Sequence, residues 1–442
     1  MTALGSTLEE RDMSQSAPIL IVGCGQAGAM AAAELRKLGF EGRIVMVGSE
    51  THAPYERPPL SKAVLASEAG SVQVALHPEG FYAEHSIEVR LGVEVQSIDT
   101  ANSVAYCSDG EVLPYASCLI ATGGDARVLT TLPAGTPSVH YLRTMDDANG
   151  LREAMRTAKD VLVIGGGFLG LEAASTALDQ GLRVTLAESN HRLLGRAVPA
   201  ELADWLEQRV RSRGVDLRLG FEIANIDIGE DGLRFRFADG TTLQPSLVVV
   251  AVGLTPRVNL AADAGLALHP ANGGIEVNEL CQTSQSGVYA AGDCTSQYQP
   301  AFGVHMRLES WQNANEQARI AAAAMLGVQT QPAALPWFWT DQFGCNVQML
   351  GAGHPDCTYV WRDASPADAD TPKFLLLGTR QGCLCQAIAV NAGGDLRQLR
   401  PLVGQVVAQH LQKLANHTIA LRPLVRDIQA DLVASAPPVA QL

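Results

Sequence analysis

Two glycine-rich turns of the same design carry the clearest chemical signal in this chain. The first runs from Gly23 to Gly28 (Gly-Cys-Gly-Gln-Ala-Gly) and the second from Gly165 to Gly170 (Gly-Gly-Gly-Phe-Leu-Gly). Each turn follows a strand-like apolar run and precedes an alanine-rich, helix-like stretch, the context in which this motif binds the pyrophosphate of a dinucleotide. Backbone N–H groups at a helix N-terminus attract phosphate, and glycine lets the chain come close to it. We therefore expect two dinucleotides on one polypeptide.

An acidic residue closes each of these two units. Glu50 and Glu188 each end the next strand-like run, about twenty residues beyond the glycine turn. A carboxylate at this place accepts hydrogen bonds from a ribose 2′-hydroxyl and repels a 2′-phosphate, so if the second unit takes a nicotinamide nucleotide, Glu188 favours NADH over NADPH. The nearby Arg192 and Arg196 keep NADPH open, since either side chain could reach a phosphate.

Length and composition limit the classes to which this chain can belong. With 442 residues it is long enough for two or three domains, and its net charge of −14 argues against nucleic acid as a partner. No apolar run reaches the length of a membrane span, so no membrane is expected as a partner. The first sixteen residues are acidic and lack an apolar core, which predicts a cytoplasmic location. Nine cysteines without a zinc-ligand spacing predict reduced thiols and no metal site.

The residue pattern outside the two turns predicts the strands and helices that must hold them in place. Prolines stiffen the segment from Pro54 to Lys62, which leads into a short helix. Strands are expected within the ranges 89–98, 104–113, 118–124, 215–227, 233–237, 248–253 and 287–293, with a turn at Asp109-Gly110. An alanine-rich helix is expected over 310–326.

The Rossmann-type pattern stops before Trp337, and a separate α+β domain is expected from there on. Its strands are predicted near 347–350, 358–362, 374–379 and 385–390, and its helix near 399–414. The spacer 364–372 and the tail beyond residue 432 are expected to be mobile.

The order of several motifs gives the chain a family resemblance. Between the two glycine turns and after them come Pro54–Lys62, Ala121-Thr122-Gly123, Ala291-Gly292-Asp293, Glu309–Ala314 and Phe338–Phe343. In this order, from Pro18 to Leu424, the chain resembles the FAD-dependent, oxygenase-coupled NADH:ferredoxin reductases. Arg257 is a departure, because the family usually shows asparagine there.

This resemblance implies an α/β fold with two Rossmann-like dinucleotide-binding domains, of the glutathione-reductase-like, FAD/NAD(P)-linked type, and a C-terminal α+β domain. The segments expected are a disordered extension (1–16), the first part of the FAD-binding domain (17–132), the NAD-binding domain (133–254), the second part of the FAD-binding domain (255–331), and the C-terminal α+β domain with a mobile tail (332–442).

Site residues are carried over from the family's motifs to matching places in this chain. The resemblance assigns FAD binding to Gly23, Gly25, Gln26, Ala27, Gly28, Glu50, Arg57, Lys62, Val95, Ala121, Thr122, Gly123, Arg127, Gly292, Asp293, Ser310 and Trp311. It assigns NAD binding to Gly165, Gly167, Phe168, Leu169, Gly170, Glu172, Glu188, Arg196, Val252 and Gly253.

Three of these residues are expected to take part in the chemistry. The resemblance places Lys62 near the flavin, Glu172 over the nicotinamide and within reach of Lys62, and Trp311 beside the isoalloxazine. A cation such as Lys62 would stabilise the negative charge of reduced flavin. Judged without the family, Lys62 is also compatible with a solvated lysine at a helix start, Glu172 with an ordinary acid of an amphipathic helix, and Trp311 with a core aromatic.

The activity implied is hydride transfer from NADH to FAD, followed by single-electron transfer to a [2Fe–2S] ferredoxin that supplies an oxygenase. Disulfide reductases of this superfamily carry a cysteine near the flavin, roughly where this chain has Pro58–Lys62, and this segment has none. We therefore expect neither Cys24 nor Cys294 to act in a dithiol relay. An acidic ferredoxin would dock on a local basic patch, to which Arg57 and Arg307 are expected to contribute.

Two other functions stay open. A rubredoxin reductase would share the architecture and differ only in the electron acceptor, which the sequence does not identify. A flavoprotein like apoptosis-inducing factor would use NADH to change its assembly, although the absence of basic runs and of a targeting segment makes this less favoured. A monomer or a homodimer is expected.

Overall fold

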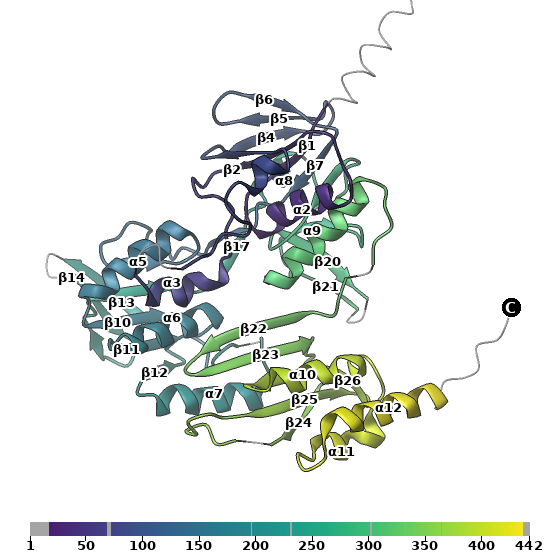
Figure 1. The fold of residues 1–442 in the computed structure, drawn as a ribbon. Coiled ribbons are helices and arrows are strands. Elements are labelled where there is room, and N and C mark those ends of the chain that lie inside the picture. The colour runs from purple at the N-terminus through teal and green to yellow at the C-terminus, as the bar shows by residue number, and fades with distance from the viewer. Residues whose placement is uncertain are drawn as a thin grey trace, which may run out of the picture.

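A computed structural model describes residues 17–68, 72–195, 197–229, 232–300, 303–331, 333–363 and 365–435. Three bodies are visible in Figure 1: one built around β1 and β7, one around β10 and β11, and a C-terminal sheet below them. The N-terminal extension 1–16 and Arg196 lie outside the described residues. In the described part of the chain, no helix is both long and apolar enough to cross a bilayer.

The first body is built on a parallel five-stranded sheet. Its order is β19 (Val288–Ala290), β7 (Ser117–Ile120), β1 (Ile19–Val22), β2 (Ile44–Gly48) and β3 (Ile87–Leu91). Helices α2 (Gln26–Lys37) and α9 (Trp311–Met325) pack on the face to which Ile19 and Ile21 point. Because β1 pairs with β2 on one side and β7 on the other, its carboxyl end is the switch point at which such sheets bind ligands.

The second body repeats this plan. Its parallel sheet has the order β12 (Asp216–Leu219), β11 (Arg183–Glu188), β10 (Asp160–Ile164), β16 (Leu247–Val250) and β9 (Val139–Tyr141). Helix α6 (Phe168–Asp179) follows the second glycine turn, and α5 (Met145–Thr157) and α7 (Ala200–Ser212) complete the helical elements of this body. The two glycine turns therefore leave equivalent central strands, β1 and β10.

Smaller sheets cover the open faces and join the bodies. Two meanders comprise β4 (Val95–Asp99), β5 (Val104–Cys107) and β6 (Val112–Pro114), and β13 (Ile223–Gly229), β14 (Gly232–Phe237) and β15 (Thr242–Leu243). The pair β8 (Gly124–Ala126) and β17 (Leu254–Pro256) is antiparallel, and β18 (Ile275–Val277), β20 (Thr295–Gln299) and β21 (Val304–Met306) form a further sheet. Short helical turns are η1 (Pro58–Ser61), α3 (Ala63–Ala66), α4 (Phe81–Glu84) and α8 (Asn259–Asp263).

Two predicted strands were too long. The range 89–98 contains the end of β3 and most of β4, which belong to different sheets, and the chain turns between them at Gly92, whose φ is +70°. The range 215–227 is likewise divided between β12 and β13, with a turn at Gly220, whose φ is +63°. Both runs are apolar enough to look continuous, and a glycine in the left-handed region marks each break.

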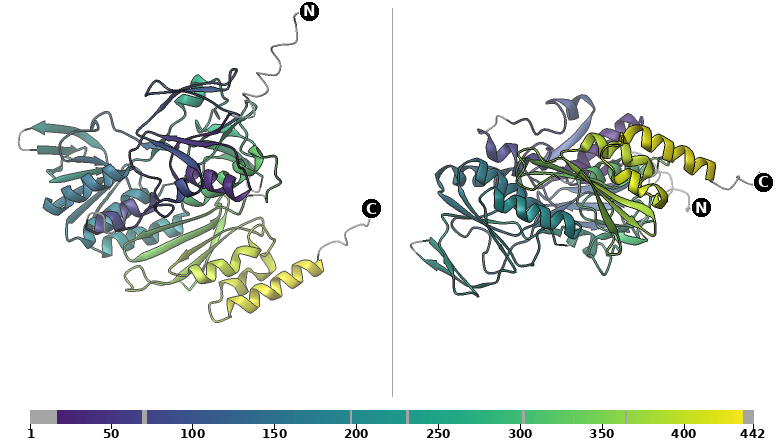
Figure 2. Two further views of the ribbon diagram at one scale, coloured as in Figure 1. Left: turned by 45° about the horizontal axis from the view of Figure 1, so that its top comes forward. Right: turned by 90° about the horizontal axis from the view of Figure 1, so that it is seen from below.

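The C-terminal body is an antiparallel sheet covered by helices. Its order is β22 (Trp337–Gln342), β23 (Cys345–Gly351), β26 (Cys383–Val390), β25 (Phe374–Arg380) and β24 (Thr358–Arg362). Instead of the helix predicted near 399–414, the chain forms α10 (Gly393–Leu399), η2 (Arg400–Leu402), η3 (Ala408–His410) and α11 (Leu411–Ala415). Pro401 and Gly404, whose φ is +89°, interrupt the helical path. The final helix α12 (Leu421–Ser435), yellow in Figure 2, was not predicted.

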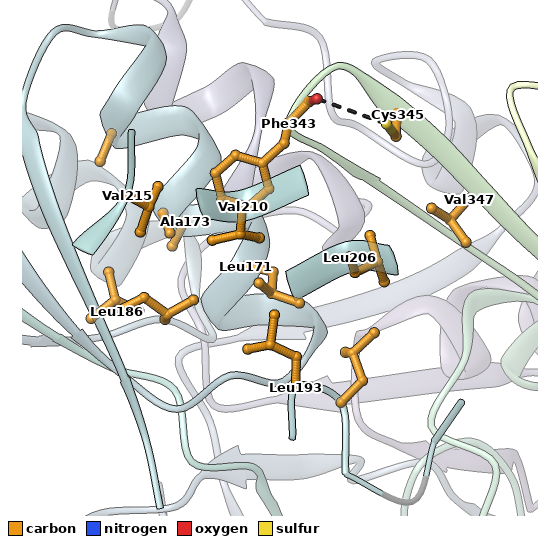
Figure 3. Packing of buried hydrophobic residues seen from close by; sticks show 14 of the residues in the cluster. Leu171, Ala173, Leu186, Leu193, Leu206, Val210, Val215, Phe343, Cys345 and Val347 are labelled. Carbon is orange, nitrogen blue, oxygen red and sulfur yellow. Dashed lines mark hydrogen bonds between the residues drawn. The ribbon is translucent and has the colours of Figure 1, made fainter. Parts of the chain in front are cut away.

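The C-terminal body is anchored to the second body through a shared core. Phe343, at the turn between β22 and β23, packs among Leu171, Val210 and other residues of that body (Figure 3). Beside it, the buried Arg209 of α7 donates hydrogen bonds to the carbonyl oxygens of Phe343 (3.0 Å), Ala367 (3.0 Å) and Ala369 (2.6 Å). One side chain thus satisfies three carbonyl groups of the C-terminal body.

Replacing Arg209 should loosen this joint. In Arg209→Met the three carbonyl groups lose the guanidinium donor, while the apolar part of the side chain is largely kept. The free energy of unfolding should fall by about 3 kcal/mol. The apparent thermal midpoint, followed by circular dichroism, should fall by several degrees. Arg213→Met, at the exposed end of the same helix, is the matched control and should leave the midpoint nearly unchanged. Equal midpoints for the two variants would contradict this role of Arg209.

Candidate active site

Both glycine turns open into one crevice. It has a volume of about 1940 Å³ and is lined by the carboxyl ends of β1 and β10, the segment 57–62, and Trp339 of β22. The crevice therefore lies where the two parallel sheets and the C-terminal sheet meet. A single cavity that reaches both turns allows two dinucleotides to approach each other end to end.

The first and third glycines of the first turn are required by the protein itself. A Cβ atom on Gly23 would lie 2.2 Å from the carbonyl oxygen of Ala121, and Gly23 has φ +115°. A Cβ atom on Gly28 would lie 1.9 Å from the carbonyl oxygen of Gly23. These two glycines thus let the strand, the turn and helix α2 pack together.

The middle glycine has a different explanation. Gly25 lines the crevice, has extended backbone angles that other residues adopt, and a Cβ atom there would meet no atom of the described chain within 4 Å. Gln26, beside it, keeps a buried side-chain oxygen without a hydrogen-bond partner among the described residues. Bare backbone N–H groups at a helix N-terminus fit the pyrophosphate of FAD, whereas the Gln26 oxygen is an acceptor and needs a donor such as a hydroxyl.

The second turn repeats this division of roles. A Cβ atom on Gly165 would lie 2.3 Å from the carbonyl oxygen of Ala251, and one on Gly170 would lie 2.0 Å from that of Gly165. Gly167 again lines the crevice, and a Cβ atom there would meet no atom of the described residues within 4 Å. This turn fits the pyrophosphate of the nicotinamide nucleotide in the same way.

Glu50 is held at the end of β2 by two neighbours. Arg57 donates to its Oε1 at 2.5 Å, and the Tyr55 hydroxyl donates to its Oε2. Burial acts to raise the pKa of Glu50, but the Arg57 charge and the two hydrogen bonds outweigh it, so the pKa lies below its usual range. Glu50 is thus an ionised acceptor, available to a ribose hydroxyl in the crevice.

Asp293 also has a charged partner, which sequence reasoning missed. Arg143 pairs with Asp293 at 2.9 Å and donates from Nε to the carbonyl oxygen of Gly124 at 2.8 Å. Arg143 lies between β9 and α5 in the sequence, and its backbone carbonyl accepts a hydrogen bond from Arg57 at 2.7 Å. No local motif marks Arg143, because its partners are distant in the sequence.

The expected basic docking patch is wrong for the two residues named for it. The Arg57 side chain is only 26% exposed and is paired with Glu50, and the Arg307 side chain is 17% exposed and paired with Glu309 at 2.9 Å. Burial raises the pKa of Glu309, and Arg307 partly offsets that shift. Both arginines therefore serve ion pairs within the fold.

Lys62 and Glu172 meet in the crevice. Lys62 Nζ lies 3.0 Å from Glu172 Oε1 and 3.5 Å from a carboxylate oxygen of Asp341. The Ser61 hydroxyl donates to Glu172 at 2.5 Å, and the Thr340 hydroxyl donates at 2.6 Å. Side-chain exposure is 21% for Lys62 and 9% for Glu172, so the solvated alternatives considered for them do not describe this pair.

The pair is fixed by three different elements. Ser61 and Lys62 come from the proline-stiffened segment, Glu172 from the first turns of α6, and Thr340 from β22 of the C-terminal body. A charge held by partners on separate rigid elements does not need to reorganise when a neighbouring charge changes. Ser61 and Thr340 were missed by sequence reasoning, although both lie inside the motifs that carry the family resemblance.

Trp311 lines the crevice together with a second tryptophan. Its indole N–H donates to Glu56 at 3.3 Å, and its ring meets that of Trp339 edge to face, with 5.9 Å between centroids. The centroid of the Trp339 ring lies 5.9 Å from Lys62 Nζ. Trp311 is half-buried at the crevice wall. Its ring is thus available to an aromatic ligand.

Glu188 is oriented from both sides at the end of β11. One of its oxygens accepts the backbone N–H of Gly166 at 2.7 Å, and the other accepts that of Asn190 at 2.8 Å. Arg192 lines the crevice too, and its guanidinium donates to the Gly195 carbonyl at 2.5 Å. Arg196, the other candidate for a phosphate, lies outside the described residues.

Most of the remaining predicted residues also face the crevice. The lining includes Ala27, Val95, Ala121, Thr122, Gly123, Gly292, Ser310, Phe168, Leu169, Val252 and Gly253. Gly28, Gly170 and Arg127 do not belong to it. The two glycines act through packing, and Arg127 is exposed, so its contact with phosphate stays a prediction.

The thiols near the crevice are poorly suited to a relay. Cys24 is the single cysteine among the described lining residues, and burial, followed by the charge of Glu50, raises its pKa to about 12. Cys294 is fully buried, which raises its pKa as well. This agrees with the expectation that neither thiol carries electrons.

One group of side chains of metal-ligand type occurs elsewhere in the described residues. Potential ligand atoms of His269, Glu276 and His305 lie within 4.8 Å of one another. The two imidazole rings are stacked, with 4.6 Å between centroids and 23° between planes. We assign no metal to this group.

The class of protein follows from this fold and site. A family model described as pyridine nucleotide-disulphide oxidoreductase matches residues 17–318, and one described as reductase C-terminal matches residues 337–425. The first covers more than half of the chain, so the chain belongs to the pyridine nucleotide-disulphide oxidoreductase family.

Particular relatives narrow this class. The 3-phenylpropionate/cinnamic acid dioxygenase ferredoxin–NAD(+) reductase component of Photorhabdus laumondii is 38% identical over 384 residues, covering 87% of this chain and 95% of the relative. Rubredoxin-NAD(+) reductase of Pseudomonas putida is 38% identical over 336 residues, covering 76% of this chain and 86% of the relative. The solved structure of a covalent putidaredoxin reductase–putidaredoxin complex has a TM-score of 0.88 at 31% identity. The match covers 94% of this chain and 99% of the solved chain.

These findings confirm the family resemblance and the fold class predicted from the sequence. They also confirm the enzyme class and the two cofactors, because this group consists of FAD-containing, NADH-dependent reductases. The chain is therefore an oxidoreductase that uses FAD and NADH.

Proposed function

We propose that this enzyme passes the electrons of NADH through FAD to a [2Fe–2S] ferredoxin that supplies an oxygenase. Bound FAD accepts a hydride from the nicotinamide and gives up its electrons one at a time. The observation that carries the proposal is the single crevice that joins both glycine turns at the Lys62–Glu172 pair, with no cysteine pair among its described lining residues. Electrons from this site must then leave to an external carrier.

The residues of the first body would hold FAD. Gly25 and the backbone N–H groups at the start of α2 present the pyrophosphate site, Glu50 the ribose site, and Asp293, oriented by Arg143, the ribityl site. The nicotinamide nucleotide would use Gly167 and Glu188 of the second body in the same manner. The domain boundaries given above, with the FAD-binding domain interrupted by residues 133–254, are part of this proposal.

The catalytic residues of the proposal are Lys62, Glu172 and Trp311. Lys62 presents a positive charge that favours reduced flavin, and Glu172 orients that charge and closes the nicotinamide side of the crevice. Trp311 and Trp339 would cover the aromatic rings and exclude water, which hydride transfer requires. Ser61 and Thr340 are positioning residues, since they act through Glu172.

Glu188 should make the enzyme prefer NADH. In Glu188→Gln one of the two acceptor oxygens stays, the other becomes an amide NH2, and the charge that repels a 2′-phosphate is lost. The ratio of kcat/KM for NADH over that for NADPH should fall by about tenfold, equivalent to about 1.4 kcal/mol. Glu207→Gln, on the exposed face of α7, is the control and should leave the ratio unchanged. An unchanged ratio in Glu188→Gln would assign the preference to other residues, Arg192 first.

The acceptor is tested by offering two carriers under the same conditions. The FAD-loaded enzyme and NADH should reduce a [2Fe–2S] ferredoxin from an oxygenase system with a kcat/KM at least about tenfold above that for rubredoxin. Faster reduction of rubredoxin would favour the rubredoxin reductase function, which the Pseudomonas putida relative supports. Reduction of neither carrier, together with dimerisation on adding NADH, would favour the interaction protein.

Assembly and location complete the proposal. A monomer or a homodimer is proposed, and sedimentation of the FAD-loaded protein distinguishes the two. We place the reaction in the cytoplasm, where the free thiols of this chain are kept reduced.

A further inference from the structure

Two cysteines of the C-terminal sheet lie unusually close together. The sulfur atoms of Cys357 and Cys385 are 2.7 Å apart. Even carbon atoms in van der Waals contact stay about 3.5 to 4.0 Å apart, whereas a disulfide bond measures about 2.05 Å. The two thiols are therefore already inside the distance of an ordinary packing contact.

The local structure of the sheet explains how they meet. Cys385 lies on β26 opposite the irregularity between Gly378 and Thr379 of β25, where Gln386 pairs with Gly378 and Leu384 with Thr379. Cys385 is the extra residue of this bulge, and bulges redirect side chains. Its thiol donates to the Gly378 carbonyl at 3.3 Å.

Cys357 reaches the same place from the other side of β25. It directly precedes β24, and its neighbour Thr358 is paired with Thr379 at the bulge. Because Cys357 lies outside the strand, the ladder does not fix its backbone. A movement of roughly 0.65 Å, the difference between 2.7 Å and the bond length of about 2.05 Å, would bring the sulfurs to bonding distance.

The surroundings distinguish these thiols from most others in the chain. Cys107, Cys118, Cys281, Cys294 and Cys345 are buried, whereas Cys357 and Cys385 are only half-buried. Burial, followed by the hydrogen bond to Cys357, raises the pKa of Cys385 to about 12. Cys385 is held within strand β26, whereas Cys357 lies just outside β24, so we assign the first attack on an oxidant to Cys357.

We propose that Cys357 and Cys385 form a redox-sensitive dithiol, which closes to a disulfide when glutathione disulfide is available as the oxidant. The Cys357 sulfur attacks glutathione disulfide, forming Cys357–glutathione and releasing one glutathione. The Cys385 sulfur then attacks the Cys357 sulfur, forming the Cys357–Cys385 bond and releasing the second glutathione. Two protein thiols are oxidised by two electrons, and one glutathione disulfide is reduced to two glutathiones.

The bond would link β26, the central strand of this sheet, to the residue that precedes the edge strand β24. Residues 357 and 385 are 28 positions apart, and β25 lies between the strands that they link. Closing a loop of this length stabilises the folded chain, so the oxidised protein should have a thermal midpoint several degrees higher. The same sheet contains β22 with Thr340, so the bond would fix the edge opposite the crevice, not the crevice itself.

The test uses the full-length, FAD-loaded protein. It is treated with glutathione disulfide, its remaining thiols are alkylated, and its peptides are mapped by mass spectrometry without reduction. The expected product is a pair of peptides linked through Cys357 and Cys385, lighter by two hydrogen atoms than the two free peptides. Cys383, on the same strand, should be found alkylated.

Variants provide the controls. Cys357→Ser and Cys385→Ser should each lose the linked peptides and the rise in thermal midpoint, and Cys383→Ser should keep both. In Cys385→Ser, glutathione should stay attached to Cys357, because the resolving thiol is missing. Alkylation of both residues after oxidation of the wild-type protein, a persistent glutathione adduct on it, or a bond to Cys383 would each overturn the proposal.

Discussion

Gly25→Val should yield a folded protein that does not retain FAD. The reason is that a Cβ atom at this residue meets none of the described residues within 4 Å and projects into the crevice instead. It would displace the pyrophosphate from the backbone N–H groups of α2. Losing two such charge-assisted hydrogen bonds, at about 1.5 to 3 kcal/mol each, weakens FAD binding by roughly 10² to 10⁴.

The second turn provides the reciprocal variant. Gly167→Val should keep its flavin, yet its Kd for NADH should rise by a similar factor, because Gly167 faces the crevice with the same free space. The ratio of flavin to protein is read from the absorption spectrum, and the Kd from titration. The two variants should therefore separate the two nucleotide sites.

A matched control checks that the volume of valine alone is harmless. Gly150, on the exposed side of α5, also has no atom of the described part of the chain within 4 Å of a Cβ atom, and it lies outside the crevice lining. Gly150→Val should change neither flavin content nor NADH binding. Retention of FAD by Gly25→Val at the wild-type level would show that this turn does not hold the pyrophosphate.

Lys62→Met should slow reduction of the bound flavin by NADH by about 10² to 10³-fold. The substitution keeps the length of the side chain and removes the positive charge that Glu172 holds in place at 3.0 Å. FAD should still bind, since Gly25, Glu50 and Asp293 are unchanged. The rate constant is measured by mixing the enzyme with NADH under anaerobic conditions and following the loss of flavin absorption.

The control for this variant is Lys37→Met. Lys37 is an exposed lysine at the end of α2, paired with Glu34 at 2.9 Å, and its replacement should leave the rate unchanged. A rate in Lys62→Met within twofold of wild type would mean that the Lys62 charge plays no part in the reaction.

The glycine turns and their strands could be predicted because their signal is local. Each motif joins a strand to a helix within a few residues, and the close contacts of Gly23 with Ala121 and of Gly165 with Ala251 require glycine at those places. The Lys62–Glu172 contact was foreseen only through the family motifs. Nothing in the intervening sequence indicates that η1 and α6 meet.

The errors arose where distant partners or a few turn residues decide the structure. Arg57 and Arg307 were assigned to an exposed patch because their carboxylate partners could not be inferred from sequence spacing. The helix expected over 399–414 was broken by Pro401 and Gly404, whose effect was outweighed by the apolar pattern around them. Arg143 reaches the crevice and Thr340 reaches Glu172 through tertiary packing, which leaves no periodic signal.

The most direct test of the account is a sequential anaerobic mixing experiment on the wild-type enzyme. Mixing with NADH should bleach the flavin, and subsequent mixing with oxidised [2Fe–2S] ferredoxin should restore the flavin spectrum while the iron–sulfur absorption falls. The number of ferredoxins reduced should be two for each NADH consumed, because a hydride carries two electrons and the acceptor takes one. Flavin that stays oxidised with NADH, or reduced flavin that ferredoxin does not reoxidise, would contradict the account.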